Sequence, residues 1–549
     1  MTAPRGAARW SAVAGVVAGL VLVAVAELAS LAFSSSSAPF VAVGGAFVDI
    51  VPPGVKDLVI RLFGTWDKLV LFASMGAVYL VLTALIGRLG AARRALAAVL
   101  LAGLGALAMA LVLTRAQNTA LDVLPTLFGT LVAVPALLLL LRTVHGPAAS
   151  GTEGAPGADG VGAAEGTGTA DGAGAADGAG TTGSADEARA RWTRRRALLG
   201  VGAVGVLAVV GAAVGRGITA SREVAARAAR YVLPAPRTSA PPIPAEAQVE
   251  LEGMPRYLTP NQDFYRIDTA LAVPRVDPAA WSLRIHGLVD QELEIDLAAL
   301  LEEPMVEAHV TLTCVSNAVG GDLAGNATWL GVPVRTLLER AGVQDGADMV
   351  LSRSIDGFTA STPLEALTDD RDSLIAVGMN GEPLPAEHGY PVRMVVPGLY
   401  GYVSATKWLT ELKVTRFEDD VAYWSTRGWS ERGPIKTASR VDVPRSFAEL
   451  EADADGAVML GGTAWAQQRG VSAVEVRIDD GQWREAQLGA EVTADTWVQW
   501  SLRWGDAEPG DHSVTVRATD GEGTLQTSQR AAPAPDGASG WHTVRFTVV

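Results

Sequence analysis

The chain has 549 residues, a formal net charge of −15 and a hydrophobic content of 49 %. This length is too great for one domain, and an acidic chain without a basic stripe argues against nucleic acid as a partner. The single cysteine, Cys314, excludes an intramolecular disulfide. None of the six histidines stands at zinc-ligand spacing from it.

Most of the apolar excess lies before residue 217. Five stretches are long and apolar enough for membrane-spanning helices, at 10–33, 69–86, 95–113, 121–141 and 197–214. The apolar stretch at 40–60 is interrupted by Pro52, Pro53 and Lys56, which predicts a loop on the outer side. We therefore predict a four-span membrane domain over residues 1–145 and a fifth span within residues 191–217.

Basic residues set the expected orientation of the spans. With a cytoplasmic N-terminus, the inner loops hold Arg5, Arg9, Arg88, Arg93, Arg94, Arg142, Arg191, Arg194, Arg195 and Arg196, whereas the outer loops hold only Lys56, Arg61, Lys68 and Arg115. Five spans then place everything after Arg216 on the extracytoplasmic side of the cell membrane. No histidine lies inside a span to hold a b-type haem, so we expect these spans to anchor the chain or dock a partner.

Residues 146–190 are a Gly/Ala/Asp-rich tract with almost no large apolar side chains, which predicts a disordered linker. The following "RWTRRRALLGVGAVGVLAVVGAAVGR" resembles a twin-arginine export signal, with Arg194 and Arg195 before a Gly-rich span. The positive-inside rule explains the same arginines, so both interpretations stay open. Residues 218–250 are predicted to form a Pro/Ala-rich connector.

Two soluble domains are predicted after the connector. "WSLRIHGLV" and "PVRMVVPG" predict strands, whereas "DLAALLEE" and "PVRTLLERAG" have helical apolar spacing, the latter ending at Gly342. This mixture indicates an α+β domain over residues 251–420. From 421 to 549, "VSAVEVRIDDGQWREAQL", "HSVTVRATDGEG" and "WHTVRFTVV" predict short strands, whose spacing favours an immunoglobulin-like β-sandwich.

Four stretches of the α+β region resemble the molybdopterin domain of the sulfite oxidase family: "TPNQDFYRID", "VTLTCVSN", "WLGVPVRTLLERAG" and "VGMNGEPLPAEHGYPVRMVVPGLYGYVSATKWL". The predicted sandwich is similar to the family's second domain, which often mediates dimerisation. The resemblance implies molybdenum held by one molybdopterin, two-electron oxygen-atom transfer on a small molecule, and a homodimer. No CxxCH haem motif is present, so electrons would pass through a separate partner, a cytochrome or a quinone-linked protein.

The resemblance also implies which residues hold the cofactor. Cys314 would supply the thiolate that binds molybdenum, a soft ligand suited to this metal. Further positions match cofactor-contacting residues of the family: Asn261, Tyr265, Arg266, Ser354, His388, Arg393, Ser404, Thr406 and Lys407. The turn that carries Ser404 and Thr406 is one residue longer than in the family. Taken alone, Cys314 also fits a buried structural cysteine.

Two departures from the family concern the substrate. The family places an arginine just after the cysteine, where this chain has Ala318 and Val319, and a tyrosine before the "MNG" turn, where it has Val377. A pocket with fewer cations should bind sulfite weakly. We expect Gly320 and Gly321 to open room for a larger or neutral substrate. The substrate and reaction direction stay unassigned. A sulfite dehydrogenase and a non-catalytic binding protein with a vestigial molybdopterin fold are the alternatives.

Overall fold

The computed structural model describes residues 5–52, 55, 62–63, 66–116, 118–144, 231–505 and 507–549. They belong to two compact units, a helical one within Met1–Val224 and a β-rich one within Ala225–Val549. The predicted linker at 146–190, the fifth span with its twin arginines and the first part of the connector lie outside the described residues.

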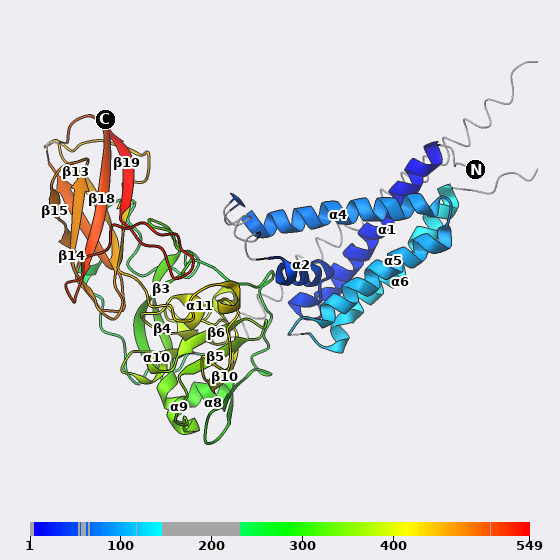
Figure 1. Ribbon diagram of the computed structural model, residues 1–549, viewed down its shortest axis with the longest axis horizontal. Coiled ribbons are helices and arrows are strands. Elements are labelled where there is room, and N and C mark those ends of the chain that lie inside the picture. Colours follow the sequence, from blue (N-terminus) through cyan, green and yellow to red (C-terminus); the bar gives the residue numbers. More distant parts are fainter. Residues whose placement is uncertain are drawn as a thin grey trace, which may run out of the picture. The chain divides into compact units, whose positions relative to one another are not determined.

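The first unit consists of apolar helices (Figure 1). The helices α1 (Arg5–Ser30), α4 (Asp67–Gly90), α5 (Arg94–Leu113) and α6 (Leu124–Val144), the last preceded by the 3-10 turn η3 (Ala120–Val123), are long and apolar enough to cross a membrane. They coincide with the first four predicted spans. After the short turn η1 (Ser35–Ser37), α2 (Pro39–Ile50) occupies part of the predicted outer loop. Its 12 residues give about 18 Å, which is too short to cross.

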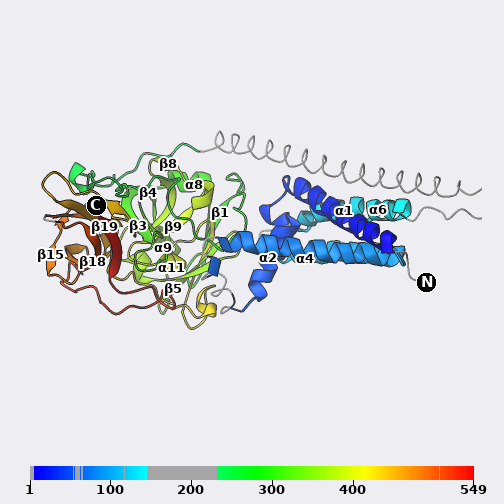
Figure 2. The ribbon, with the colours of Figure 1, turned by 90° about the horizontal axis from the view of Figure 1, so that it is seen from above.

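Small residues let these helices approach closely. α4 and α6 both pack against α1 (Figure 2). A methyl group added at Gly15 would collide with the backbone of Gly87, and one at Gly87 would collide with the carbonyl of Ser11. Such contacts between small residues are typical of helices packed in a membrane. Large apolar side chains face outwards instead, as Val99 does with 65 % exposure, which suits contact with lipid.

The second unit begins with an α+β domain on two sheets (Figure 1). One sheet has the order β2–β1–β10–β5–β6, and the other has the order β3–β4–β7–β8 with β9 paired to β7. The strands are β1 (Ser282–Gly287), β2 (Leu293–Asp296), β3 (Val306–Thr313), β4 (Ala324–Pro333), β5 (Met349–Ser354), β6 (Thr359–Pro363), β7 (Leu374–Met379), β8 (Glu382–Pro383), β9 (Arg393–Val395) and β10 (Leu409–Thr415). The helices are η4 (Ala245–Ala247), α8 (Leu297–Glu302), α9 (Val334–Ala341), α10 (Glu365–Thr368), η5 (Ala386–His388) and α11 (Gly401–Ser404). The strands and helices predicted here are confirmed, including the left-handed cap of α9 at Gly342.

The C-terminal region consists of two further sheets that enclose one apolar core. Their strand orders are β11–β13–β17–β16 and β12–β19–β18–β14–β15. After η6 (Ser425–Arg427) the strands are β11 (Ala438–Val443), β12 (Glu449–Leu450), β13 (Val458–Trp465), β14 (Val471–Ile478), β15 (Trp483–Glu485), β16 (Gln487–Leu488), β17 (Val498–Trp504), β18 (Gly510–Asp520) and β19 (His542–Val548). Trp500 and Phe546 are among the largest side chains of this core. The predicted strands of this region are confirmed.

The two β-rich parts are joined by buried contacts. Just before β17, Trp497 donates through its backbone N–H to the Thr311 hydroxyl of β3 at 2.8 Å and through Nε1 to the Tyr257 carbonyl at 3.0 Å. Residues 231–250, predicted as a connector, form a parallel bridge to β3. The segment before β1 thus packs onto both parts, and buried contacts join the two parts to each other.

Candidate active site

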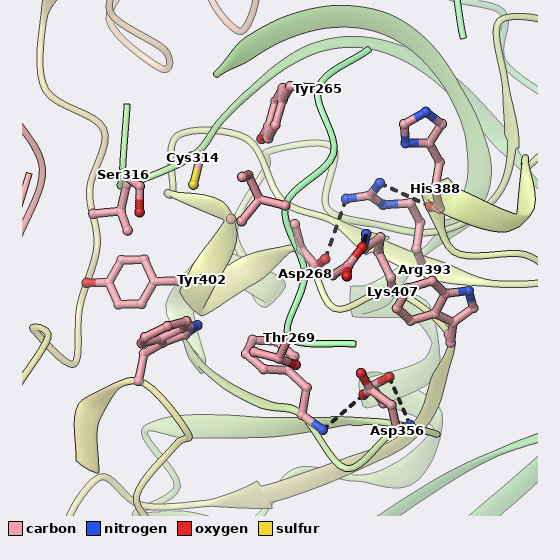
Figure 3. Close-up of a pocket in the computed structure, with 18 of the residues that line it drawn as sticks. Tyr265, Asp268, Thr269, Cys314, Ser316, Asp356, His388, Arg393, Tyr402 and Lys407 are labelled. Carbon is pink, nitrogen blue, oxygen red and sulfur yellow. Dashed lines mark hydrogen bonds and ion pairs between the residues drawn. The ribbon is translucent and has the colours of Figure 1, made fainter. Parts of the chain in front are cut away.

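One cavity of the α+β domain gathers most of the predicted site residues (Figure 3). It contains about 890 Å³ of empty space, part of it open to solvent. Six of the ten predicted residues line it: Tyr265, Cys314, Ser354, His388, Arg393 and Lys407. They come from the segment before β1, the loop after β3, the end of β5, η5, β9 and the turn after α11.

Cys314 is held where β3 ends. Its N–H donates to the Leu323 carbonyl at 2.9 Å, and its carbonyl accepts the Asn317 N–H at 3.0 Å, which closes a turn. The Asn317 side chain accepts the Leu323 N–H and ties this loop to the start of β4. The cysteine is only 8 % exposed. Burial raises the pKa of its thiol, and this effect outweighs hydrogen bonds from Ser316, which lower the pKa. A soft metal ion at this place would favour the thiolate form.

The C-terminal region holds the far end of the cysteine loop. Arg440 donates through Nη1 to the Gly321 carbonyl at 2.9 Å. His542 accepts the Val441 N–H through Nδ1 at 3.0 Å and presses its ring against Gly320. Neither glycine lines the main cavity. The expectation that they open room for a larger substrate is therefore wrong, because Gly320 makes room for His542 of β19 and Gly321 makes room for the Asn317 side chain of the same loop.

Replacing Gly320 by alanine should destabilise the chain more than a matched replacement elsewhere. Its φ of 79° lies in the left-handed region, and a methyl group would collide with the His542 ring. Gly456 has a φ of 71° and nothing within 4 Å of an added methyl, so Gly456→Ala introduces backbone strain alone. We expect Gly320→Ala to lower the free energy of unfolding by about 2 kcal/mol more than Gly456→Ala. Denaturant unfolding followed by tryptophan fluorescence measures the free energy of unfolding of both variants. Equal losses of stability would contradict the close contact between Gly320 and His542.

Arg393 lies across the cavity from Cys314 (Figure 3). Its buried guanidinium donates to three backbone carbonyls, those of His388 at 3.1 Å, Met394 at 3.2 Å and Ala405 at 3.4 Å. Burial lowers its pKa to about 10, so the side chain stays charged at neutral pH. A charged fork of donors in a fixed orientation suits an anionic, acceptor-rich ligand.

Lys407 and Asp268 form a buried ion pair on the same side. Nζ lies 2.7 Å from Oδ2, and the side chains are 10 % and 4 % exposed. Burial lowers the pKa of Lys407 to about 8, against the opposing effect of Asp268. Arg266 donates to the same carboxylate at 2.9 Å and does not line the cavity. Asp268 is not among the predicted site residues, although it stands two residues after Arg266 in a segment that resembles the family.

His388 is held in its neutral form. Its Nε2 lies 2.8 Å from the Asn261 carbonyl oxygen, so this nitrogen carries the proton. Burial, with the charge of Arg393 nearby, lowers the pKa of His388 to about 4. The Asn261 side chain bonds Met379 and Asn380 instead of lining the cavity. Asn261 therefore supports His388 through its main chain.

The hydroxyls of Ser404 and Thr406 are used within the protein. Ser404 donates to the Tyr400 carbonyl at 3.0 Å, and Thr406 shares a hydrogen bond of 2.7 Å with the Ser352 hydroxyl. Both residues are fully buried and neither lines the cavity. They brace the turn that leads to Lys407. Ser354, in contrast, lines the cavity at the end of β5.

The aromatic wall of the cavity matches no motif in the sequence. It is formed by Phe358, Tyr402, Trp424 and Trp429. The ring of Trp429 lies 5.9 Å from that of Tyr402 and 6.0 Å from that of Trp424, measured between centroids. Both tryptophans follow residue 420, the predicted end of the α+β domain. They belong to no motif, and only the fold brings them to the site.

The chain should lose stability as the pH falls from about 6.5 to about 4. Burial lowers the pKa values of His388 and His542 to about 4, with further lowering by nearby arginines. The unfolded chain takes up these protons near pH 6.5 and the folded chain only near pH 4, so acid favours unfolding. His542→Gln should remove about 2 kcal/mol of this loss by pH 4.5. Unfolding of the detergent-solubilised chain at several pH values measures it.

His512 provides the control for this pH dependence. It is half-buried, and Asp479 raises its pKa against the effect of desolvation, so its protonation favours folding. His512→Gln should therefore leave the acid-induced loss in place. An unchanged acid slope in His542→Gln would contradict the lowered pKa of that histidine.

Comparisons with known proteins bear on the same region. A family model described as "Oxidoreductase molybdopterin binding domain" matches residues 270–424. The "Uncharacterized oxidoreductase YuiH" of Bacillus subtilis (strain 168) is 34 % identical over 157 residues, which cover 29 % of this chain and 76 % of that protein. Mitochondrial sulfite oxidase of Mus musculus is 31 % identical over 359 residues, which cover 56 % of this chain and 64 % of that protein. The chain thus spans less than two thirds of that sulfite oxidase.

A solved structure also aligns with the chain. It is the sulfane dehydrogenase SoxCD from Paracoccus pantotrophus, with a TM-score of 0.45 and 23 % identity over 54 % of this chain and 81 % of that chain.

The cavity suits the cofactor of the matched family. A buried thiol stands on one side, and a charged arginine and a buried lysine stand on the other, as an anionic pterin with a thiolate-bound metal requires. Cys314, Arg393 and Lys407, which carry these groups, all lie within the range that the family model matches. The chain therefore belongs to the sulfite oxidase family of molybdopterin-dependent oxidoreductases, and its cofactor is molybdenum bound to molybdopterin.

Proposed function

We propose that the chain is a membrane-anchored oxidoreductase that carries out two-electron oxygen-atom transfer on the extracytoplasmic side. The observation that carries this proposal is the cavity with Cys314 on one side and Arg393 and Lys407 on the other. When bound, the cofactor supplies the two-electron redox chemistry. The protein binds and orients it and keeps bulk water away.

Each cavity residue has a definite part in this proposal. Cys314 is the metal ligand. Arg393 and Lys407 hold the anionic part of the pterin, because both are charged donors that line the cavity. Tyr265 and Ser354 offer hydroxyls, and the neutral His388 offers its second ring nitrogen. Four predicted residues do not line the cavity, namely Asn261, Arg266, Ser404 and Thr406. They act through the segments that they brace.

The helices and the C-terminal region have supporting parts. We assign α1, α4, α5 and α6 to a four-span anchor with a cytoplasmic N-terminus, which the basic residues of the inner loops support. Residues 251–420 form the core of the catalytic domain, and residues 421–549 contain an immunoglobulin-like sandwich that is suited to dimerisation. A separate cytochrome or quinone-linked protein exchanges electrons with the site, and the anchor keeps that partner close.

A sulfite dehydrogenase is the second candidate function. The identity to mitochondrial sulfite oxidase favours it. The residues after Cys314 argue against it, because Val315 and Ser316 line the cavity where a cation would attract sulfite. A non-catalytic binding protein would have no need of a buried thiol placed opposite two buried cations.

Purified protein from a host that makes molybdopterin should contain about one molybdenum atom per chain. Elemental mass spectrometry measures this content, and protein from the same host without molybdopterin synthesis is the control. A chain that stays empty under conditions that load a sulfite oxidase would contradict the proposed function.

A further inference from the structure

We propose that Arg440 of the C-terminal region is a positioning residue for the metal-binding thiol, with Asp442 and His542 as its supports. This inference rests on the proposed function, because it takes Cys314 as the ligand of molybdenum. The C-terminal region thereby takes part in the geometry of the metal site. The reason lies in how the loop of residues 314–323 is held.

The loop that carries Cys314 joins β3 to β4 and has little apolar support of its own. Its residues 318–321 are alanine, valine and two glycines, which are half-buried or exposed and offer no large side chain for packing. Residues 314–316 line the main cavity, whereas residues 317–320 line a second cavity with about 400 Å³ of empty space, part of it open to solvent. The loop therefore lies between two empty spaces and has room to move.

Hydrogen bonds from outside hold this loop at one point. At its base, the Cys314 N–H donates to the Leu323 carbonyl at 2.9 Å. In the described part of the chain, one hydrogen bond reaches residues 315–322 from a residue outside the loop, and it runs from Nη1 of Arg440 to the Gly321 carbonyl at 2.9 Å. The position of the loop tip therefore depends on this guanidinium.

Arg440 is itself fixed by buried polar groups. Its Nε lies 2.7 Å from Oδ1 of Asp442, which stands two residues further along β11, and the two side chains are 9 % and 12 % exposed. Thr463 of β13 donates to the other carboxylate oxygen at 3.0 Å. The attraction within a buried ion pair often fails to offset the desolvation of its charges, so such a pair is weak evidence for stability. This pair instead aims a charged donor at one carbonyl of the cysteine loop.

His542 holds the strand beside that guanidinium. Its Nδ1 accepts the Val441 N–H at 3.0 Å, so β19 fixes β11 directly next to Arg440. Its ring also lies against Gly320, which limits how far the loop can move towards β19. Partners that orient a metal ligand typically change metal affinity or activity by about 10–100-fold when they are removed. Arg440 acts one step further out, because it orders the backbone from which the thiol extends.

The first test follows the thiol in full-length protein prepared without the cofactor. The double variant Arg440→Leu/Asp442→Asn removes the donor to Gly321 and leaves no unpaired charge in the core. Cys314 should then react with iodoacetamide at least ~10-fold faster than in wild type, because the loop opens more often. The rates are measured without denaturant, and unfolding transitions show that each variant is folded.

An ion pair elsewhere in the C-terminal region provides the control. Arg517 of β18 and Glu475 of β14 lie 2.8 Å apart and line neither cavity. Arg517→Leu/Glu475→Gln should therefore leave the alkylation rate at its wild-type value. Arg440→Lys serves as a second variant if the double variant does not fold. Its donors sit on a single nitrogen, so it should alkylate at least ~3-fold faster than wild type.

The second test follows the metal in the loaded enzyme. Partial reduction gives the paramagnetic Mo(V) state, whose electron paramagnetic resonance spectrum depends on the orientation of the sulfur ligand. The g-values of both Arg440 variants should differ from those of wild type, whereas the control variant should keep the wild-type spectrum. A purely structural role of Arg440 would lower stability and leave the spectrum unchanged.

The outcomes separate the inference from the proposed function. If wild type holds molybdenum and the Arg440 variants match the control in alkylation rate and spectrum, the proposed function stands and the positioning role is wrong. Faster alkylation with an unchanged spectrum also overturns the positioning role, because the cofactor alone would then order the loop. A wild-type chain that takes up no molybdenum overturns the proposed function and, with it, the ligand that Arg440 positions.

Discussion

Replacing Cys314 by serine should reduce turnover of every substrate by about 10³-fold or more while the chain stays folded. A serine hydroxyl is protonated at neutral pH and is a hard ligand, so it cannot replace a soft thiolate on molybdenum. The loop should keep its shape, because Cys314 is held through its main-chain N–H and carbonyl. Steady-state rates, the molybdenum content and the unfolding transition of wild type and Cys314→Ser are compared.

The single cysteine makes an internal control possible. Every thiol signal of the chain comes from Cys314. In the loaded enzyme this thiol should resist alkylation by iodoacetamide, and in protein prepared without the cofactor it should react faster. Equal alkylation rates in the two preparations would show that the thiol is not a metal ligand. Full activity of Cys314→Ser would show the same.

Local sequence patterns predict secondary structure correctly where a single periodicity of apolar residues dominates a segment. In β14 the residues Val474, Val476 and Ile478 alternate as the sequence predicted, and all three are buried. The four long apolar helices follow from length and hydropathy in the same way. The prediction of a loop at 40–60 is wrong only as far as Ile50, because Pro39 at the first position begins a helix and the breaking prolines come after Ile50.

The site depends on contacts between distant segments, which no local pattern encodes. The resemblance placed Cys314 and Arg393 in one site, but the sequence between them does not show that they face each other across a cavity. The glycine pair after Cys314 signalled a close approach of some group. At Gly320 that group is His542, more than 200 residues further along the chain. A prediction based on the loop alone assigned the space to substrate.

The domain boundary shows a similar limit. The change in residue pattern near residue 421 correctly predicted a region of short strands. The segment between that point and β11 nevertheless returns to the cavity and brings Trp424 and Trp429 to its wall. The local pattern of apolar and polar residues indicates the secondary structure of a segment. Tertiary packing decides which cavity that segment lines. The aromatic wall was therefore beyond the reach of the sequence.

Arg393→Lys should lower the free energy of unfolding by about 3 kcal/mol and strongly reduce the molybdenum content. The native guanidinium reaches three carbonyls at once, from His388 to Ala405, because its donors form a planar fork. A lysine ammonium is a compact point charge on a flexible stem. The ammonium therefore leaves at least one buried carbonyl without a hydrogen bond, and its own charge is still removed from water at this buried position, which costs free energy. Denaturant unfolding and elemental mass spectrometry measure the two effects.

Arg353→Lys is the matched control, because it makes the same chemical change on the surface. The Arg353 side chain is 45 % exposed and makes an ion pair with Glu411 at 3.1 Å, so its replacement should change stability by no more than about 0.5 kcal/mol. If Arg393→Lys loses stability but each folded molecule still binds about one molybdenum atom, Arg393 serves the fold and not the cofactor. If it behaves like Arg353→Lys in both measurements, the three carbonyls do not depend on the fork of donors. Only a joint loss of stability and metal shows that one buried charge orders the cavity and holds the pterin.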